Sequence, residues 1–385
     1  MTQRELAAAR ITDPALRQAY TRCRELNAAH GRTYFLATRL LPPDRRPAVH
    51  ALYGFARYVD DLVDIPGRSA SPEAISTRID EAEQQLTDAL ADYGNTPGRG
   101  TLDADARTGR ALTGSALDSS ALDSDGRDSS ALDGNGSVGG GNGSEGGGNG
   151  SEGSSPGGRV PVALALADTV RRYAIDPALF SAFLSSMRMD LLLRDYPTRA
   201  DLQRYTYGSA QVIGLQLLPV LGTVTDRAEA APFAAALGDA FQLTNFLRDI
   251  AEDLDRGRIY LPADELAAFG VDRGRLEWCR AHGLADAAVR AALTDQVATT
   301  RAVYRRAAQG IEMLSPWARP CVATAYTLYS EILNRIEYLD YNVFARRATV
   351  GATRKLRVAG PAAARAWWVR RSLPSEPART ARPTS

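Results

Sequence analysis

Two segments of the sequence each contain a pair of aspartates four residues apart. In both segments other polar residues precede the pair. The first segment is ALYGFARYVDDLVD, residues 51–64, and its pair is Asp60 and Asp64. Each residue of a helix advances by about 100°, so Tyr53 and Arg57 fall on the same face as this pair. The apolar residues between them then point elsewhere. A polar stripe that ends in two carboxylates therefore runs along a largely apolar helix.

The second segment, FQLTNFLRDIAEDLDRGRIYLP, residues 241–262, has the same design. Gln242 and Asn245 lead along one helix face to a second pair of aspartates. This pair is Asp249 and Asp253. Carboxylates at this spacing repel each other and destabilise a helix by about 0.2–0.5 kcal/mol. The repetition therefore calls for a compensating positive charge.

A divalent cation would offset the repulsion within each pair. Mg²⁺ prefers oxygen ligands and usually joins one or two carboxylates to substrate phosphates. Two such stripes facing each other would hold a small Mg²⁺ cluster, with Mn²⁺ as a possible substitute, and would clamp a diphosphate from both sides. A single pair of this kind is most often a solvated helix face. Two pairs, each extending a polar stripe in an apolar helix, favour the metal site.

The composition indicates a globular protein whose net charge is too small to suggest a function. Of the 385 residues, 44% are hydrophobic and 24% are charged, which suits a chain that buries a substantial core. The 46 Lys and Arg residues nearly balance the 45 Asp and Glu residues, so the charge does not point to nucleic acid. The cysteines are scattered, the N-terminus lacks an apolar signal segment, and no apolar run is long enough to span a membrane. We therefore expect a cytoplasmic location.

Along most of the chain, apolar residues recur at spacings of three and four, and no stretch keeps the alternation of a strand for long. The sequence thus predicts an all-α protein, with a catalytic helical domain made of residues 1–94 and 159–350. Residues 95–158 are rich in Gly, Ser and Asp. Such a segment buries too little apolar surface to offset its ordering entropy, so we expect a disordered insertion within that domain. Residues 351–385 are expected to form a basic, partly disordered tail.

The acidic segments belong to a set of blocks that resembles the squalene/phytoene synthase family, and bacterial phytoene synthases look most similar. In chain order the blocks are HGRTYFLATRLLPPDRRPAVHALYGFARYVDDLVD, MRMDL, YTYGSAQVIGLQLLPVLG, QLTNFLRDIAEDLDRGRIYLP and YNVFARRA. The resemblance implies an isoprenoid synthase fold, a single helical domain around a deep apolar cavity. It also implies that the two aspartate motifs face each other at the cavity mouth.

The resemblance assigns roles residue by residue. The metal-binding and catalytic carboxylates are Asp60, Asp64, Asp249 and Asp253, and Tyr205 matches an aromatic residue near the reacting carbons. Positions that match the substrate site are Thr33, Tyr34, Tyr53, Arg57, Gln242, Asn245, Ile213 and Gly214. Apart from the resemblance, Arg258 is expected at the end of the second acidic helix, where it could reach a phosphate. An interaction with the dipole at the helix C-terminus is the competing explanation. Candidate aromatic faces for a carbocation are Tyr34, Phe35, Tyr205 and Tyr207.

Some positions depart from the family pattern or carry weaker signals. Gly31 stands where some relatives have a serine that helps bind diphosphate. Gln211 stands where a glycine is usual and would change the shape of the cavity if it pointed inward. Asp190, in MRMDL, is functional by resemblance, whereas Arg346 and Arg347 are interpreted as surface charges.

The reaction implied by the resemblance is a head-to-head condensation of two geranylgeranyl diphosphates, through prephytoene diphosphate, to phytoene, with release of diphosphate and without NADPH. No side chain stands out as the general base, and released diphosphate is a candidate. The nearest alternative is the same fold acting on farnesyl diphosphate to give squalene, presqualene diphosphate or dehydrosqualene. A non-catalytic scaffold relative is a further alternative, although it should have lost motif aspartates.

The segment RKLRVAGPAAARAWWVRR, residues 354–371, combines arginines with two tryptophans. Such a segment is suited to a lipid interface, where it would give peripheral contact with the inner face of the membrane. A basic tail without a partner is the competing interpretation. The expected partners are thus prenyl diphosphates and a membrane surface, with no nucleic acid.

Overall fold

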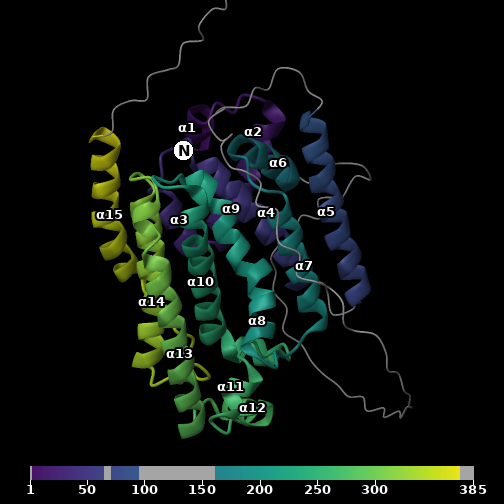
Figure 1. Cartoon of the computed structure of the whole chain (residues 1–385), viewed down its shortest axis with the longest axis vertical. Helices are drawn as coiled ribbons and strands as arrows, with labels where there is room; N and C mark the ends of the chain where they lie inside the picture. Colours follow the sequence, from purple (N-terminus) through teal and green to yellow (C-terminus); the bar gives the residue numbers. More distant parts are fainter. Residues whose placement is uncertain (1, 65–70, 95–160, 373–385) are drawn as a thin grey trace, which may run out of the picture. The chain divides into compact units, whose positions relative to one another are not determined.

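The computed structural model describes residues 2–64, 71–94 and 161–372, which fall within one unit of packed helices (Figure 1). In these ranges the chain forms no strand and has only two isolated β-bridges, Asp195 with Ile259 and Thr223 with Leu314. The prediction of an all-α fold is confirmed. The predicted insertion, residues 95–158, lies outside the described residues, and so does the end of the predicted tail.

The helices before the first long gap are α1 (Thr2–Ala8), α2 (Pro14–His30), α3 (Arg32–Thr38), α4 (Arg46–Asp64) and α5 (Pro72–Gly94). Then follow α6 (Pro161–Tyr173), α7 (Ala178–Leu192), α8 (Arg199–Thr206), the π-helix η2 (Tyr207–Gln211), α9 (Val212–Leu221) and α10 (Arg227–Asp255). The last elements are α11 (Ala263–Ala267), α12 (Arg273–His282), α13 (Ala287–Ala308), the 3₁₀-helix η3 (Ile311–Met313), α14 (Arg319–Tyr338) and α15 (Ala352–Ser372).

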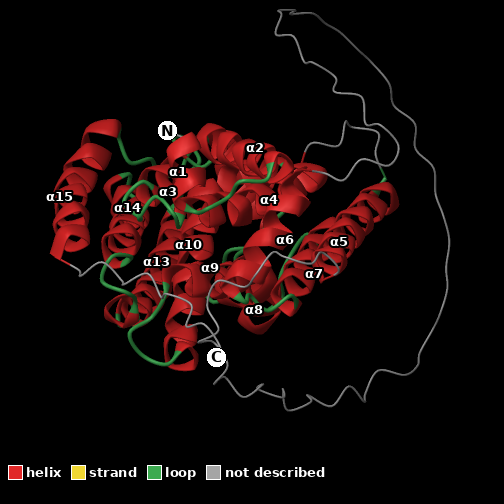
Figure 2. Cartoon of the chain, turned by 90° about the horizontal axis from the view of Figure 1, so that it is seen from above, coloured by secondary structure: helices red, strands yellow, loops and turns green. Residues whose placement is uncertain are grey.

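The longest helix, α10, carries the second acidic segment and lies among α9, α13 and α14 (Figure 2). Its start is fixed by Asp226, whose side chain accepts a hydrogen bond from the backbone N–H of Ala228. The first acidic segment is the C-terminal part of α4, which packs against α2, α6, α7 and α9. The two acidic segments thus lie on helices that are held from several sides.

Glycines let the backbone of the π-helix come very close to its neighbours. A Cβ atom at Gly238 of α10 would lie 2.2 Å from the carbonyl oxygen of Ala210 in η2. A Cβ at Gly208 of η2 would lie 2.2 Å from the carbonyl oxygen of Ala182 in α7. Only glycine fits at such distances, because a methyl group would overlap the carbonyl oxygen. The π-helix is therefore clamped between α7 and α10.

No described helix is long and apolar enough to cross a membrane. α15 packs against α14 and α3, and its Ala366 is buried in the cluster formed with these helices. The part of the predicted tail up to Ser372 is therefore a docked helix.

We predict that Gly238→Ala lowers the free energy of unfolding by about 1–3 kcal/mol, since the added methyl group overpacks the contact with η2. The matched control is Gly360→Ala in α15, where no described atom lies within 4 Å of the new Cβ. That control should gain up to about 1 kcal/mol from helix propensity. Urea denaturation of both variants checks this, and equal stability of the two would contradict the proposed close packing.

Candidate functional site

An apolar cavity of about 360 Å³ lies among α3, α4, η2, α9, α10 and α14. Along α10 its wall runs from Ala230 to Asn245, which spans about 22 Å at the rise of a helix. Phe233, Leu237 and Phe241 contribute much of this wall. The cavity therefore follows the helix axis as a long apolar tunnel, in agreement with the deep apolar cavity that the family resemblance implies.

A second, polar pocket of about 230 Å³ adjoins the end of the cavity that lies near the aspartates. Its charged lining residues are Asp60, Asp190, Asp249, Asp253, Arg248, Arg256 and Arg258. Four residues, Asp60, Ser209, Gln242 and Asn245, line both spaces. Since the same side chains border both, a molecule with an apolar chain and an anionic head can occupy the two together.

The structure brings three of the four predicted metal ligands to this pocket, Asp60 from α4 and Asp249 and Asp253 from α10. Asp64 is the last residue of α4, and its side chain lies outside the described part. Among the side chains that the structure describes, no three acidic, histidine or cysteine groups gather closely enough to hold a metal ion. The metal site therefore stays a prediction.

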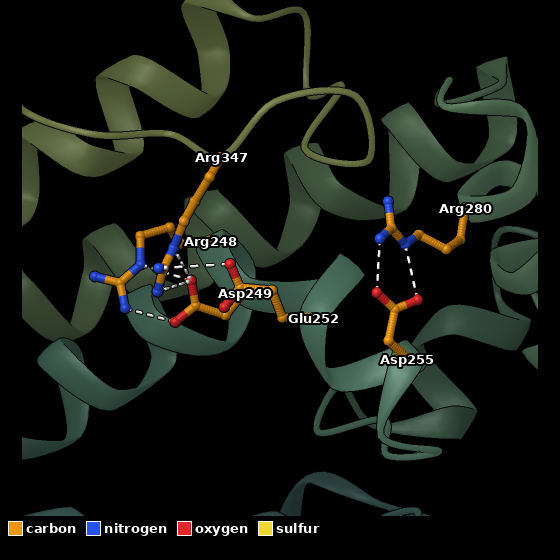
Figure 3. Close-up of polar contacts among 6 residues, drawn as sticks. All are labelled: Arg248, Asp249, Glu252, Asp255, Arg280 and Arg347. Atoms are coloured by element: carbon orange, nitrogen blue, oxygen red, sulfur yellow. Dashed lines mark hydrogen bonds and ion pairs between the residues drawn. The ribbon is translucent and has the colours of Figure 1, made fainter. Parts of the chain in front are cut away.

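Asp249 is held by two arginines (Figure 3). Arg248 lies with Nη2 2.5 Å from Oδ2 of Asp249, and Arg347 donates from Nε to Oδ1 at 2.8 Å. Arg347 also lies 3.4 Å from Glu252. The interpretation of Arg347 as a surface charge missed this contact, because the segment after α14 folds back over α10. A cation that approaches Asp249 must therefore compete with both guanidinium groups.

Asp253 lies one turn further along α10, and the pKa of its carboxyl is raised to about 7. The main cause is burial, and the charge of Asp249 adds to it. Arg256 and Arg258 act in the opposite direction. Asp253 is therefore poised to lose or bind a proton near neutral pH.

Arg258 and Asp190 form a buried pair beside Asp253. Nη1 of Arg258 lies 3.0 Å from Oδ2 of Asp190, and the hydroxyl of Tyr260 donates to Oδ1 at 2.7 Å. Arg258 and Asp190 are 9% and 6% exposed. The predicted phosphate contact of Arg258 is thus compatible with its place in the lining, and the structure pairs its guanidinium with Asp190.

The other predicted substrate residues divide into two groups. Tyr34, Tyr53, Gln242, Asn245, Ile213 and Gly214 line the apolar cavity, and Tyr205 lines the polar pocket. Thr33 and Arg57 are absent from both linings. The guanidinium of Arg57 is paired with Asp61, one turn further along α4, which draws it away from the pocket.

Of the four candidate aromatic faces, two reach the site and two do not. Tyr34 lines the cavity and packs against Phe241 and Tyr329, with ring centroids 6.0 and 5.0 Å away. Phe35 packs instead against His50, and Tyr207 is 47% exposed. Tyr329 of α14 lines neither space but supports the ring of Tyr34, and no local pattern in the sequence predicts this contact.

Both departures from the family pattern have a structural explanation. A Cβ at Gly31 would lie 2.5 Å from Oδ1 of Asn27 and 2.9 Å from Cζ of Tyr53, so the tyrosine ring fills the space of a serine side chain. Gln211 lies beside the half-buried Asp239, where it opposes the rise that burial causes in the pKa of that carboxyl, and is absent from the cavity lining. It therefore points away from the cavity and does not narrow it.

The comparisons with known proteins all lead to squalene and phytoene synthases. The family model for squalene/phytoene synthase matches residues 27–124 and 131–354 of the chain. A 15-cis-phytoene synthase of Synechococcus elongatus is 33% identical over 352 residues, which cover 89% of this chain and 91% of that protein. A phytoene synthase of Arthrospira platensis is 32% identical over 355 residues, or 89% and 92% of the two chains.

A solved structure of a dehydrosqualene synthase in complex with a ligand superposes with a TM-score of 0.66. It covers 92% of this chain and 98% of that one, at 23% identity. A squalene synthase from Alicyclobacillus acidocaldarius has a TM-score of 0.62 at 21% identity, covering 87% of this chain and 99% of that one. At these identities the likeness establishes the fold alone.

Proposed function

The chain belongs to the squalene/phytoene synthase family and is a prenyltransferase-type enzyme, and from that premise we propose that it is a phytoene synthase. It would condense two geranylgeranyl diphosphates head to head, through prephytoene diphosphate, to phytoene and diphosphate. The observation that carries the proposal is the junction between the long apolar cavity and the polar pocket. Its support from relatives is the identity of more than 30% to phytoene synthases over 89% of the chain.

The two spaces divide the work of such a reaction. The prenyl chain would lie along α10 in the apolar cavity, and the diphosphate would lie in the polar pocket. There Arg248, Arg256 and Arg258 are placed to stabilise the negative charge that develops on the leaving diphosphate. The apolar walls would exclude water, which would otherwise trap the allylic cation as an alcohol.

We also propose that the pocket takes Mg²⁺, with Mn²⁺ as an alternative ion. The donor set is all oxygen, which suits a hard cation. Asp60, Asp249 and Asp253 would hold it, and Asn245 adds a buried Oδ1 atom that has no hydrogen-bond partner among the described residues. The ion would supply positive charge beside the leaving diphosphate. The proposed reaction has no reductive step and so needs no NADPH.

We predict that Mg²⁺ raises the melting temperature more at pH 8 than at pH 6. Asp253 must lose its proton to bind a cation, and with a pKa of about 7 the proton competes below that pH. Asp253→Asn should remove this pH dependence. The matched control is Asp255→Asn on the same helix, where the carboxylate pairs with Arg280 at 2.6 Å, outside the pocket (Figure 3).

Thermal melting with and without Mg²⁺ at both pH values is the measurement. The Asp255→Asn protein should keep the pH dependence of the unsubstituted protein. An equal shift at pH 6 and pH 8 in the unsubstituted protein would contradict the role of Asp253.

The substrate is tested by incubating the purified protein and Mg²⁺ with geranylgeranyl or farnesyl diphosphate, without NADPH, and identifying hydrocarbons by mass spectrometry. We expect a C40 triene from geranylgeranyl diphosphate. A C30 product or presqualene diphosphate from farnesyl diphosphate alone would move the protein to the squalene branch. No product from either substrate would favour the scaffold alternative.

For α15 we propose contact with an anionic lipid surface. The helix carries six basic residues, Arg354, Lys355, Arg357, Arg365, Arg370 and Arg371, and no acidic residue. Trp367 and Trp368 are 51% and 64% exposed on it. Arginine and exposed tryptophan together suit the headgroup region of an anionic bilayer, and the basic charge favours this surface over a neutral one.

We predict that the double variant Trp367→Ser and Trp368→Ser loses most of its co-sedimentation with vesicles that contain anionic lipid, with little change in melting temperature. Trp278→Ser, which alters an exposed tryptophan of α12, is the matched control and should bind like the unsubstituted protein. Binding that is equal for all three proteins, or equal on neutral and anionic vesicles, would count against the proposal.

A further inference from the structure

Ser209 lies at the boundary between the apolar cavity and the polar pocket. It is one of the four residues that line both spaces, and it belongs to the π-helix η2. The other three are Asp60 of α4 and the two amides of α10, Gln242 and Asn245. Among the described residues that line both spaces, Ser209 alone carries a hydroxyl group.

The hydroxyl oxygen of Ser209 has no hydrogen-bond partner among the described residues and is closed off from water. A serine within a helix usually donates to the carbonyl oxygen four residues earlier. Here that carbonyl belongs to Tyr205, and it already accepts a hydrogen bond of 3.0 Å from the hydroxyl of Ser186 in α7. The acceptor that Ser209 would normally use is therefore occupied by another serine.

The backbone that carries Ser209 is held firmly. The π-helix is clamped between α7 and α10 at its two glycine contacts. The chain that enters it is held as well, because the ring of Tyr205 stacks on Tyr260 with 5.6 Å between centroids and 25° between planes. Only the torsion about the Cα–Cβ bond of Ser209 then decides where its hydroxyl points, and this torsion has three staggered positions.

A buried hydroxyl without a partner destabilises the free protein, because it has given up hydrogen bonds to water and gained none in return. A ligand that offers an acceptor at this point removes that penalty. Since Ser209 borders both spaces, a turn of its side chain brings the hydroxyl to a molecule that fills them. The hydroxyl is thus better suited to a ligand than to the fold.

The substrate of the proposed reaction has an acceptor at the same boundary. In a prenyl diphosphate, one oxygen joins carbon C1 of the apolar chain to the first phosphorus of the anionic head. With the chain in the cavity and the head in the pocket, this oxygen lies where the two spaces meet. An ionised Asp60 only accepts hydrogen bonds, and Nδ2 of Asn245 donates to Oε1 of Gln242 at 3.4 Å. Ser209 supplies a donor there whose proton is not used within the protein.

On the basis of the proposed function, we propose that Ser209 is a further catalytic residue, which donates a hydrogen bond to the oxygen that joins C1 to the diphosphate. When the C1–O bond breaks, its electron pair stays on this oxygen, which leaves as part of the diphosphate. The hydroxyl keeps its proton, and its hydrogen bond strengthens as negative charge grows on the oxygen. Because the bond is stronger in the transition state than in the bound substrate, it speeds ionisation and changes binding little.

The test compares two substitutions of Ser209 with one of Ser186. Ser209→Ala removes the hydroxyl, and Ser209→Cys keeps a side chain of similar shape with only a weak donor. Ser186→Ala is the matched variant, because it removes a hydroxyl that donates to the backbone of the same π-helix. The two alanine variants lose the same atom, but only the hydroxyl of Ser209 is without a partner in the free protein.

The first readout is the melting temperature of the free protein. Ser209→Ala should melt at the same or a slightly higher temperature than the unsubstituted protein, because it loses no internal hydrogen bond. Ser186→Ala should melt at a lower temperature, because the carbonyl of Tyr205 loses its partner. A lower melting temperature for Ser209→Ala would overturn the proposal, since the hydroxyl would then serve the fold.

The second readout is the single-turnover rate at which geranylgeranyl diphosphate gives the cyclopropylcarbinyl diphosphate, a half-reaction that begins with ionisation. We expect Ser209→Ala and Ser209→Cys to slow it by about 10- to 100-fold, as for loss of a hydrogen bond to a charged oxygen, with KM nearly unchanged. An unchanged rate in Ser209→Ala would overturn the proposal. A full rate in Ser209→Cys would do so too, because only the volume of the side chain would then matter.

Failure of the proposed function has a different sign. A C30 product from farnesyl diphosphate alone would change the substrate and leave the test in place with that substrate, because its C1–O bond is the same. The absence of product from both prenyl diphosphates in the unsubstituted protein would refute the proposed function, and the role of Ser209 with it.

Discussion

The structure depends on burying charge beside an apolar tunnel. Four aspartates and three arginines line the pocket at the end of the cavity. An isolated charge in such a place would be strongly unfavourable, so charges are paired before any ligand arrives. Arg258 pairs with Asp190, and Arg248 with Asp249. The packing of α7 and α10 around the π-helix then holds these pairs at one end of the tunnel.

This pairing also shapes what a ligand must do. A diphosphate or a cation that enters the pocket must exchange partners with the groups that are already paired, Asp190 and Asp249 with their arginines. Asp249 has two guanidinium partners, and one of them, Arg347, comes from the segment that leads into α15. Occupancy of the pocket and the position of that segment are therefore linked through a single ion pair.

Much of the site follows from the period of the helix. The spacing of Asp60 in α4 and of Asp249 and Asp253 in α10 predicts acidic stripes, and the structure brings these residues to one pocket. Arg57 shows the limit of that argument, since Asp61 at the next turn captures a side chain that the same periodicity placed on the stripe. The spacing of residues along a helix predicts which face a side chain lies on. It does not predict which neighbouring group that side chain will pair with.

What sequence could not supply is contact between distant segments. The pairing of Arg347 with Asp249 depends on how the chain returns after α14. The stack of Tyr205, Phe246 and Tyr260 joins residues whose types are equally typical of a plain core. The π-helix could not be predicted either, because nothing in YGSAQ distinguishes it from an ordinary turn of α-helix. The glycines around it are the one visible trace, and their meaning needs the neighbouring carbonyls.

The π-helix has a consequence for how this enzyme can change over evolutionary time. It sets the angle between α8, which ends beside Tyr205, and α9, which carries Gly214. Loss of one residue here would turn one helix against the other by about 100°, so every residue type would remain while the tyrosine left its stack. Most substitutions leave that angle intact. Insertions and deletions at this point, rather than point mutations, are the changes this site can least tolerate.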